Sequence, residues 1–311
     1  MELIRGIHNI LPAHHGCVLT IGNFDGVHRG HAEVIAKLVK KARQLNVPAT
    51  LMIFEPQPQE MFRGASAPAR LSSLRDKIIL LEELGIDRLV CINFNAKFAD
   101  LSAQDFIDKL LVESLGVKYL VIGDDFCFGK QRKGNFEMLQ SAGEKHQFAV
   151  VSTQSFALGD KRVSSTEIRN QLAKGNLEQA RRLLGHPFIL CGKVSHGEKI
   201  GRTLGFPTAN IALKRQVSPV RGVFAVKMYW DGSDIYDGVA NVGFRPTVNG
   251  QVCLLEVHLF DFDDDLYGRT VEVELVAKIR DEKPFKSLDA LKKQINNDAD
   301  KAKALLGNDA G

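Results

Sequence analysis

The sequence has few of the features that mark secreted, membrane or nucleic-acid-binding proteins. It holds five cysteines among 311 residues and no CxxC pair, which argues against a disulfide framework. The start lacks the basic-then-apolar order of a signal peptide, and no apolar run reaches the roughly eighteen residues of a membrane span. The net charge of +4 is small and forms no long block of like charges, so nothing indicates a nucleic-acid tail. We therefore expect a soluble, cytoplasmic protein with reduced, buried thiols and no membrane or nucleic-acid partner.

What the chain does contain is typical of globular proteins, with 44% hydrophobic and 25% charged residues and enough length for two ordinary domains. Up to residue 184, strand-like apolar runs alternate with helical patterns. The expected strands cover 17–22, 48–54, 87–92, 118–123 and 148–152, and the expected helices lie near 31–45, 72–84, 102–115 and 135–146. This alternation predicts an α/β domain at 1–184 with a mostly parallel sheet, in which ligands bind at the carboxyl ends of the strands.

The pattern changes to short alternating stretches in the second half. We expect strands at 188–195, 222–230, 235–243, 251–260 and 270–278, separated by turns such as Asp231-Gly232 and Asn249-Gly250. These turns favour hairpins, and the stretches predict a small antiparallel β-barrel at 185–311. An amphipathic helix is expected at 287–305, with an apolar stripe formed by Leu288, Leu291, Ile295 and Leu305.

The most informative segment is residues 22–31, GNFDGVHRGH, which follows an apolar strand and precedes a helical pattern. A helix N-terminus offers unpaired N–H groups and a positive dipole end, and glycines let a phosphate approach the backbone. His28 and His31 stand on one side of the first turn, where both could donate to the same phosphoryl oxygens. A histidine beside such a turn is more often a capping or surface residue, but the position after a strand favours nucleotide phosphate chemistry. No third ligand lies nearby in the sequence, so we set zinc aside.

A second chemical centre is expected in residues 192–210, GKVSHGEKIGRTLGFPTAN. Its glycines and cations are compatible with a phosphate-covering flap, although composition alone favours a solvated glycine-rich turn by about two to one. The segment is not a Walker P-loop. Thr208 and Asn210 alternate, so in an extended segment both side chains point the same way and could share one magnesium ion.

Glu256, residues 261–268 and Ser164 each have an ordinary structural explanation. Glu256 lies inside an apolar run, where an exposed glutamate on an antiparallel strand is commonplace, and we expect the nearby His258 to be structural. Residues 261–268 resemble a calcium loop only loosely, because the glycine is misplaced, and a solvated hairpin turn is favoured. Ser164 stands three residues before Glu167, as in a capping box, so a helix is expected to start at Ser165.

Several stretches together resemble a known enzyme family. Residues 22–31 have the HxGH pattern of the nucleotidylyltransferase superfamily, and the longer string is similar to the adenylyltransferase half of bacterial bifunctional riboflavin kinase/FAD synthetases. The other stretches similar to this family are 123–129 (GDDFCFG), 162–169 (RVSSTEIR), 201–210 (GRTLGFPTAN), 241–247 (NVGFRPT) and 255–261 (LEVHLFD). The resemblance covers nearly the whole chain.

The resemblance implies a Rossmann-like nucleotidylyltransferase domain that adenylylates FMN and a barrel that phosphorylates riboflavin. ATP, riboflavin and FMN would be the substrates and Mg²⁺ the cofactor. The implied catalytic residues are His28 and His31 for adenylyl transfer and Glu256 as the base that a kinase needs beside a primary alcohol. The implied nucleotide-binding residues are Gly22, Asn23, Asp25, Gly30, Arg162, Ser165, Thr166, Arg169, Gly197, Gly201 and Arg202. The implied flavin-binding residues are Asp125, Phe126 and Phe128, and the implied metal ligands are Thr208 and Asn210.

Two positions depart from or extend this pattern. Cys127 stands where the resemblance leads us to expect a basic side chain, and residues 280–282 resemble a flavin-side motif whose role we leave open. Other functions were weighed. A nucleotidylyltransferase for phosphopantetheine or nicotinamide mononucleotide leaves residues 188–285 unexplained, and a flavin or nucleotide sensor does not need His28, His31, Thr208 and Glu256. A class I tRNA synthetase would need a KMSKS-like segment, which the sequence lacks.

Overall fold

The computed structural model describes residues 1–153, 163–196, 205–213, 215, 217–230, 232–247 and 250–307. The chain divides into two compact units. The α/β unit comprises residues 1–68 and 74–163, and the barrel unit comprises residues 69–73 and 164–311. In this division the segment 164–184 belongs with the barrel, whereas we placed the domain boundary after residue 184.

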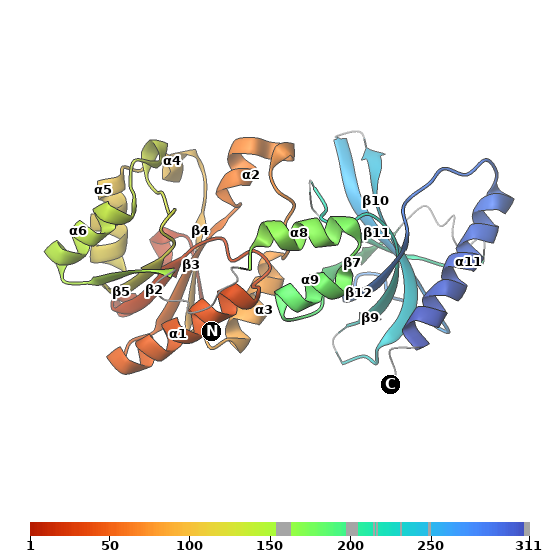
Figure 1. Ribbon diagram of the computed structural model, residues 1–311, viewed down its shortest axis with the longest axis horizontal. Helices are drawn as coiled ribbons and strands as arrows, with labels where there is room; N and C mark the ends of the chain where they lie inside the picture. The colour runs from red at the N-terminus through yellow and green to blue at the C-terminus, as the bar shows by residue number, and fades with distance from the viewer. Residues whose placement is uncertain are drawn as a thin grey trace. The chain divides into compact units, whose positions relative to one another are not determined.

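The α/β unit is built on a parallel sheet with the strand order β1-β4-β3-β2-β5-β6 (Figure 1). Its strands are β1 (Glu2–Arg5), β2 (Cys17–Ile21), β3 (Ala49–Glu55), β4 (Arg88–Asn93), β5 (Val117–Ile122) and β6 (Ala149–Ser152). Its helices are η1 (Ile7–Asn9), η2 (Pro12–His14), α1 (Arg29–Leu45), α2 (Pro58–Arg63), η3 (Gly64–Ser66), α3 (Leu74–Glu83), α4 (Ala96–Ala99), α5 (Ala103–Asp105), η4 (Phe106–Ser114), η5 (Lys130–Arg132) and α6 (Phe136–His146). The α/β class with a parallel sheet is therefore confirmed.

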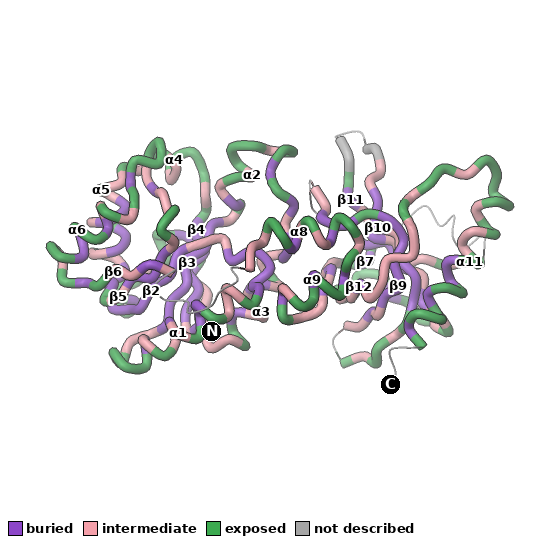
Figure 2. The backbone as a smooth tube through the Cα atoms, viewed as in Figure 1, coloured by how far each residue is buried: buried purple, intermediate pink, exposed green. Residues whose placement is uncertain are grey.

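The two faces of this sheet are covered by different helices. Residues Ile35 and Leu38 of α1 and Leu81 of α3 pack with strand residues on one face, and Phe106 of η4 and Leu139 of α6 pack on the other. The central strands are consequently buried along almost their whole length (Figure 2). Burial on both faces explains why their sequences are nearly continuous apolar runs.

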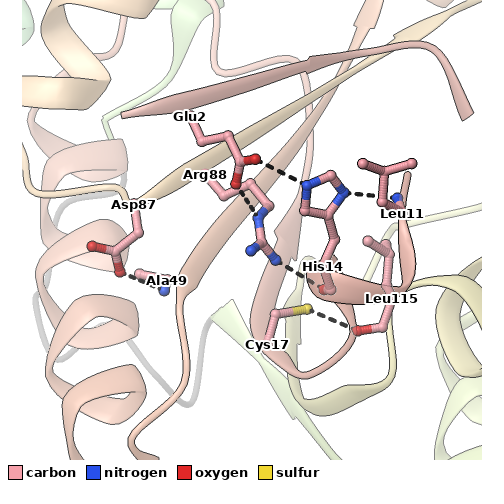
Figure 3. Close-up of polar contacts among 8 residues, drawn as sticks. All are labelled: Glu2, Leu11, His14, Cys17, Ala49, Asp87, Arg88 and Leu115. Carbon is pink, nitrogen blue, oxygen red and sulfur yellow. Dashed lines mark hydrogen bonds and ion pairs between the residues drawn. The ribbon is translucent and has the colours of Figure 1, made fainter. Parts of the chain in front are cut away.

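A polar network closes the amino-terminal ends of the strands (Figure 3). Arg88, at the start of β4, donates through Nε to Glu2 Oε2 and through Nη1 to the carbonyl of His14, both at 2.9 Å. His14 accepts the Leu11 N–H at Nδ1, so its Nε2 carries the proton that it donates to Glu2 Oε1 at 2.9 Å. The Arg88 hydrogen bond is the main reason why the pKa of Glu2 is lowered. This end of the sheet is closed by structural contacts, which leaves the carboxyl ends for chemistry.

The barrel unit contains a closed antiparallel barrel with the strand order β10-β11-β8-β7-β12-β9. Its strands are β7 (Ile189–Ser195), β8 (Ala209–Ala212), β9 (Gly222–Tyr229), β10 (Tyr236–Thr247), β11 (Gly250–Leu259) and β12 (Thr270–Arg280). Alternate residues fill the interior, and among them are the fully buried Leu190, Ile211, Phe224, Val242, Leu255 and Val273. Polar residues of the same strands therefore lie on the outer face. The predicted barrel is confirmed.

In the described part of the barrel unit, the strands are accompanied by the helices α8 (Ser165–Lys174), α9 (Leu177–Leu184) and α11 (Leu288–Gly307). The start of α8 at Ser165 is confirmed, since the Ser164 hydroxyl accepts the Glu167 N–H. The terminal helix is confirmed as well. Its predicted apolar stripe is wrong in part, because Leu288 is 64% exposed and Leu305 is 40% exposed.

The buried face of α11 is formed instead by Ala299, Ala302 and Leu306, which pack against Val223, Ala225 and Val239. Small alanines let this helix lie close to the sheet, and the search for large apolar side chains overlooked them.

Three further expectations need correction. The short strands β1 and β8 were not predicted, because four residues give too little alternation to be recognised. Residues 261–269 do not form a hairpin turn, since β11 and β12 are not neighbours in the barrel. Of the five cysteines, Cys127 and Cys191 are only partly buried. Within the described part of the chain, no helix is long and apolar enough to cross a membrane.

Candidate active sites

The turn between β2 and α1 is held in an unusual backbone conformation. Phe24 and Val27 have positive φ angles of 44° and 38°, and both side chains are buried. A β-branched residue rarely adopts such angles. Strained residues of this kind persist where the surroundings fix them, and they cluster at ligand-binding sites. The turn that the sequence singled out is therefore a fixed structure at the carboxyl end of the sheet.

His28 and His31 come together at the first turn of α1. His28 is the N-cap residue, and its Nδ1 accepts the backbone N–H of His31 at 3.3 Å. Nδ1 of His28 is thus an acceptor, so the proton of its neutral ring is on Nε2. The two imidazoles stack, with ring centroids 3.6 Å apart and an angle of 15° between the ring planes. The structure therefore shows that the two rings lie together at the start of the helix.

Burial and neighbouring cations keep His31 neutral. The pKa of His31 lies well below its ordinary value because its ring is desolvated and because His28 and Lys77 are close. Its Nδ1 is buried and has no hydrogen-bond partner among the residues that the structure describes. A buried ring nitrogen without a partner requires an explanation. A substrate oxygen would supply the missing partner.

Glycines make room for this arrangement. A Cβ on Gly30 would lie 3.3 Å from Nδ1 of His28 and 3.4 Å from the carbonyl oxygen of Val163. A Cβ on Gly22 would lie 3.1 Å from the Phe24 ring. Asp25 in the same turn is buried. The carbonyl oxygen of Val163 therefore lies beside Gly30 and close to His28.

The other predicted nucleotide-binding residues lie in several parts of the chain. Asn23 is half-buried in the turn. Ser165, Thr166 and Arg169 lie in the first turns of α8 in the barrel unit, and Nε of Arg169 donates to the carbonyl of Ala69 at 2.6 Å. The remaining predicted residues lie outside the described residues, and they are Arg162, Gly197, Gly201 and Arg202.

The predicted flavin-binding loop follows β5. The N–H of Phe126 donates to the carbonyl of Gly123 and forms a tight turn, in which Asp125 is exposed. Phe126 is half-buried and stacks on Phe128, with ring centroids 5.7 Å apart. Phe128 is only 6% exposed, so it supports Phe126 from below. Cys127 donates its thiol to the carbonyl of Asp125.

A chain of phenylalanine rings extends from this loop across the end of the sheet. Phe128 contacts Phe106, and successive ring contacts continue through Phe98 and Phe94 to Phe62, which is 67% exposed. The sequence analysis did not single out these residues. The available signal was a pair of phenylalanines, Phe54 and Phe94, at the carboxyl ends of two predicted strands. We call this chain of rings the aromatic wall; Phe106 and Phe128 in it are buried in the core of the α/β unit.

The barrel has a cleft at the start of β8. Its volume is about 440 Å³, and it is lined by Thr208 and Asn210 together with residues of the 262–267 segment. The Asn210 amide nitrogen donates to the Thr208 carbonyl at 3.2 Å, which leaves its amide oxygen on the other side. His258 donates from Nδ1 to the Pro207 carbonyl at 2.9 Å and so holds the backbone beside Thr208, as a structural histidine would.

Glu256 lies on the outer face of the barrel in a row of polar side chains. In the strand register it stands directly opposite Asn210 of β8 and Asn241 of β10. Its Oε1 accepts from Nη2 of Arg245 at 2.6 Å. The register therefore places the predicted base beside the predicted ligand Asn210, although Glu256 does not line the cleft itself. Asn241 was not predicted as a site residue, although the resemblance includes its segment.

The structure also gives roles to the segment 280–282. Arg280 forms hydrogen bonds of 2.8 to 3.1 Å with both carboxylate oxygens of the buried Asp298, and so fastens α11 to the end of β12. Glu282 accepts from Nε of Arg221 at 2.5 Å and from the Asn241 amide at 3.4 Å. Arg280 is therefore structural, and Glu282 borders the polar row that contains Glu256.

The α/β unit has a helix N-terminus with two histidines at the end of its parallel sheet. The barrel unit has a hydroxyl and an amide side chain at its cleft. Two such separate centres in one chain are typical of a class of nucleotide-dependent transferases. Residues 10–167 match the FAD synthetase family, and residues 184–306 match the riboflavin kinase family. The chain belongs to the family of bifunctional riboflavin kinases/FMN adenylyltransferases.

Individual relatives agree with this membership. The chain is 53% identical over 308 residues to the bifunctional riboflavin kinase/FMN adenylyltransferase of Escherichia coli K12, covering 99% of this chain and 98% of that protein. Identity to the Haemophilus influenzae protein of the same name is 52%, with coverage of 98% and 99%. A solved structure from Streptococcus pneumoniae, described as a macrolide-efflux protein, matches with a TM-score of 0.76 and 31% identity over 96% of this chain and 97% of that chain.

Proposed function

We propose that this protein phosphorylates riboflavin with ATP to give FMN in its barrel unit and transfers AMP from a second ATP to FMN to give FAD. The observation that carries the proposal is the presence of the two matching families, FAD synthetase and then riboflavin kinase, in this order along the chain. ATP, riboflavin and FMN are the substrates. A cytoplasmic location without a nucleic-acid partner stays a prediction from composition.

In adenylyl transfer, an oxygen of the FMN phosphate attacks the α-phosphorus of ATP in line. The bond from that phosphorus to the oxygen bridging to the β-phosphate breaks, and pyrophosphate leaves. We propose that His28 and His31 donate hydrogen bonds to the charge that develops on the α-phosphoryl oxygens, an electrostatic form of catalysis. A neutral His31 suits this role, because it can donate without holding the product by a full charge. We keep Gly22, Asn23, Asp25, Gly30, Arg162, Ser165, Thr166 and Arg169 as proposed nucleotide-binding residues.

In the kinase reaction, the primary hydroxyl of riboflavin attacks the γ-phosphorus of ATP and ADP leaves. Glu256 is the proposed base that orients this hydroxyl and accepts its proton as the new P–O bond forms. Thr208 and Asn210 are the proposed magnesium ligands, since hydroxyl and amide oxygens are hard donors that suit this ion. A magnesium ion held there would neutralise phosphate charge. Gly197, Gly201 and Arg202 are kept as proposed contacts of the nucleotide.

The flavin ring of FMN is proposed to lie against the aromatic wall beside Phe126. The half-buried ring of Phe126 is available for stacking, Phe128 supports it from below, and the exposed carboxylate of Asp125 supplies a polar contact. Truncation of Phe126 to alanine should weaken FMN binding and leave riboflavin phosphorylation unchanged. Equal KM values for FMN in this variant and the parent enzyme would contradict the assignment.

The experiment that tests the whole function is incubation of the protein with riboflavin, ATP and magnesium, followed by chromatography. FMN should appear first and FAD later, and FMN supplied with ATP should give FAD and pyrophosphate without riboflavin. Absence of FMN in the first reaction would refute the kinase activity. Absence of FAD in the second would refute the adenylyltransferase activity.

The role of Glu256 is tested by Glu256→Gln. This change keeps the size of the side chain but removes its basicity, so FMN formation should slow by about 10²- to 10⁴-fold. FAD formation from supplied FMN should persist, which shows that the protein is folded. Kinase turnover equal to that of the parent enzyme would contradict the assignment.

A further inference from the structure

The ion pair between Arg245 and Glu256 joins two neighbouring strands at positions that are not opposite each other. Arg245 lies on β10 opposite Val252, whereas Glu256 lies opposite Asn241, four residues along the same strand. This separation is about 13 Å along β10, and two long side chains are needed to span it. The outer-face position between them is Gly243, and a Cβ there would lie 2.3 Å from Oε1 of Glu282. The absence of a side chain at Gly243 therefore leaves room for the Glu282 carboxylate beside this row.

The ion pair with Arg245 uses only one of the two oxygens of the Glu256 carboxylate. Nη2 of Arg245 donates to Oε1 of Glu256 at 2.6 Å, and within the described part of the chain no other donor reaches this carboxylate. The Glu256 side chain is 22% exposed and that of Arg245 is 43% exposed. The carboxylate is thus the more deeply placed partner, and its orientation depends on the arginine.

We propose that Arg245 is a positioning residue of the riboflavin kinase reaction, which holds the carboxylate of Glu256 turned so that Oε2 faces the substrate hydroxyl. This inference rests on the proposed role of Glu256 as the base. During the reaction the riboflavin hydroxyl gives its proton to Oε2, its oxygen forms the bond to the γ-phosphorus, and ADP leaves. Arg245 stays on Oε1 and neither gains nor loses a proton.

The charged groups near Glu256 are few among the described residues. The groups that face it are Asn210 from β8, Asn241 and Arg245 from β10, and His258 on its own strand. The carboxylate of Glu282 borders the same row, where it accepts from the Asn241 amide at 3.4 Å and is paired with Arg221. Among the described residues, Arg245 is therefore the one cation that is bonded to Glu256. Its loss should leave the carboxylate of Glu256 in place but without a partner that fixes its orientation.

The test is Arg245→Gln in the full-length protein. We expect kcat for FMN formation to fall about tenfold or more, as for loss of a charged hydrogen bond, with the KM for ATP nearly unchanged. Arg245→Lys should restore part of the lost kcat, because it returns a cation that can bond to Glu256. FAD formation from supplied FMN should be unaffected.

Matched controls separate positioning from a general effect on the barrel. Arg181→Gln removes another arginine that faces a barrel glutamate, since Arg181 lies 4.0 Å from Glu274 with similar exposures of 62% and 20%, and it should leave the kinase unchanged. In the double variant, Arg245→Gln should add little to the loss caused by Glu256→Gln, because it acts through that residue.

The outcomes distinguish the two proposals. If Glu256→Gln is inactive as a kinase but Arg245→Gln has an unchanged kcat, the inference about Arg245 is wrong and the base remains. If the two losses multiply in the double variant, Arg245 contacts the substrate independently, which also overturns the inference. Full kinase turnover in Glu256→Gln would instead refute the proposed base.

Discussion

The geometry around His28 can be tested by adding a single methyl group at Gly30. The Cβ of Gly30→Ala would lie 3.3 Å from Nδ1 of His28, 3.4 Å from its Cε1 and 3.4 Å from the Val163 carbonyl oxygen. These distances require a displacement of a few tenths of an ångström. The imidazole cannot retreat freely, since it stacks on His31 at 3.6 Å and caps the His31 N–H.

We expect Gly30→Ala to have a small effect on stability and a large effect on activity. Alanine is favoured over glycine by up to about 1 kcal/mol within a helix, and a crowded rotamer costs a similar amount, so the free energy of unfolding should change by less than about 1 kcal/mol. A misplacement of 1 Å can lower a rate by about 10²-fold. A shift of half that size should therefore slow FAD formation about tenfold.

The assay compares both activities in one preparation. FAD formation from FMN and ATP is followed by chromatography, riboflavin phosphorylation serves as the internal standard, and thermal unfolding reports stability. Gly307→Ala is a matched control, because nothing lies within 4 Å of the Cβ that it would add. A Gly30→Ala enzyme with normal FAD formation would refute the claim that the position of His28 matters. Equal loss of both activities would indicate misfolding instead.

Four other predictions follow from the same structure. Replacing both His28 and His31 by alanine should slow adenylyl transfer by roughly two to four orders of magnitude with the kinase intact, measured as FAD against FMN formation; equal losses would contradict it. Lys77→Met should let the pKa of His31 rise toward its ordinary value, so the acid limb of FAD formation moves to higher pH; an unchanged limb would show that Lys77 has no such effect. Glu2, whose pKa is lowered mainly by Arg88, stabilises the fold above its ordinary pKa and loses this contribution as the pH falls through its lowered pKa. Glu2→Gln should therefore cost up to about 1 kcal/mol at pH 7 and little near pH 3 in denaturant unfolding, and a pH-independent cost would refute the link. A fragment of residues 185–311 should make FMN but no FAD, and a folded, inactive fragment would show that the boundary is wrong.

The boundary prediction has a structural refinement. The helices α8 and α9 group with the barrel, and Leu177, Ala180 and Leu184 on α9 are buried. A fragment that starts at residue 164 should consequently unfold at a higher temperature than one that starts at 185, with the same kinase turnover. Identical unfolding temperatures would mean that α9 contributes nothing to the barrel.

Sequence patterns predicted the fold where the physical signal is long and regular. The buried strands β2, β3 and β4 are mostly apolar, and the Ser164 cap marks the start of α8. Short elements such as β1 and β8 give no comparable periodicity. The buried face of α11 depends on Ala299 and Ala302, whose small side chains carry a weak hydrophobic signal but allow close packing.

The site was predictable only to the extent that local sequence determines it. The turn at 22–31 is a local feature, so glycine spacing and the HxGH pattern were enough to find it. The ring stacking of His28 and His31 follows from the capping geometry, which the pattern does not specify. The pairing of Glu256 with Arg245, and its position opposite Asn241, depend on strand register and could not be derived from residue types alone.

The two proposed reactions differ in their nucleophile, and so they need different catalytic groups. The phosphate of FMN is already an anion at neutral pH, so its attack on ATP needs charge stabilisation and alignment but no base. In the proposed reaction, the imidazoles of His28 and His31 and backbone N–H groups at a helix N-terminus supply both. The hydroxyl of riboflavin must lose a proton as it attacks, so the kinase reaction needs a base. The proposed roles of the histidine pair in the α/β unit and of Glu256 in the barrel unit follow from this difference.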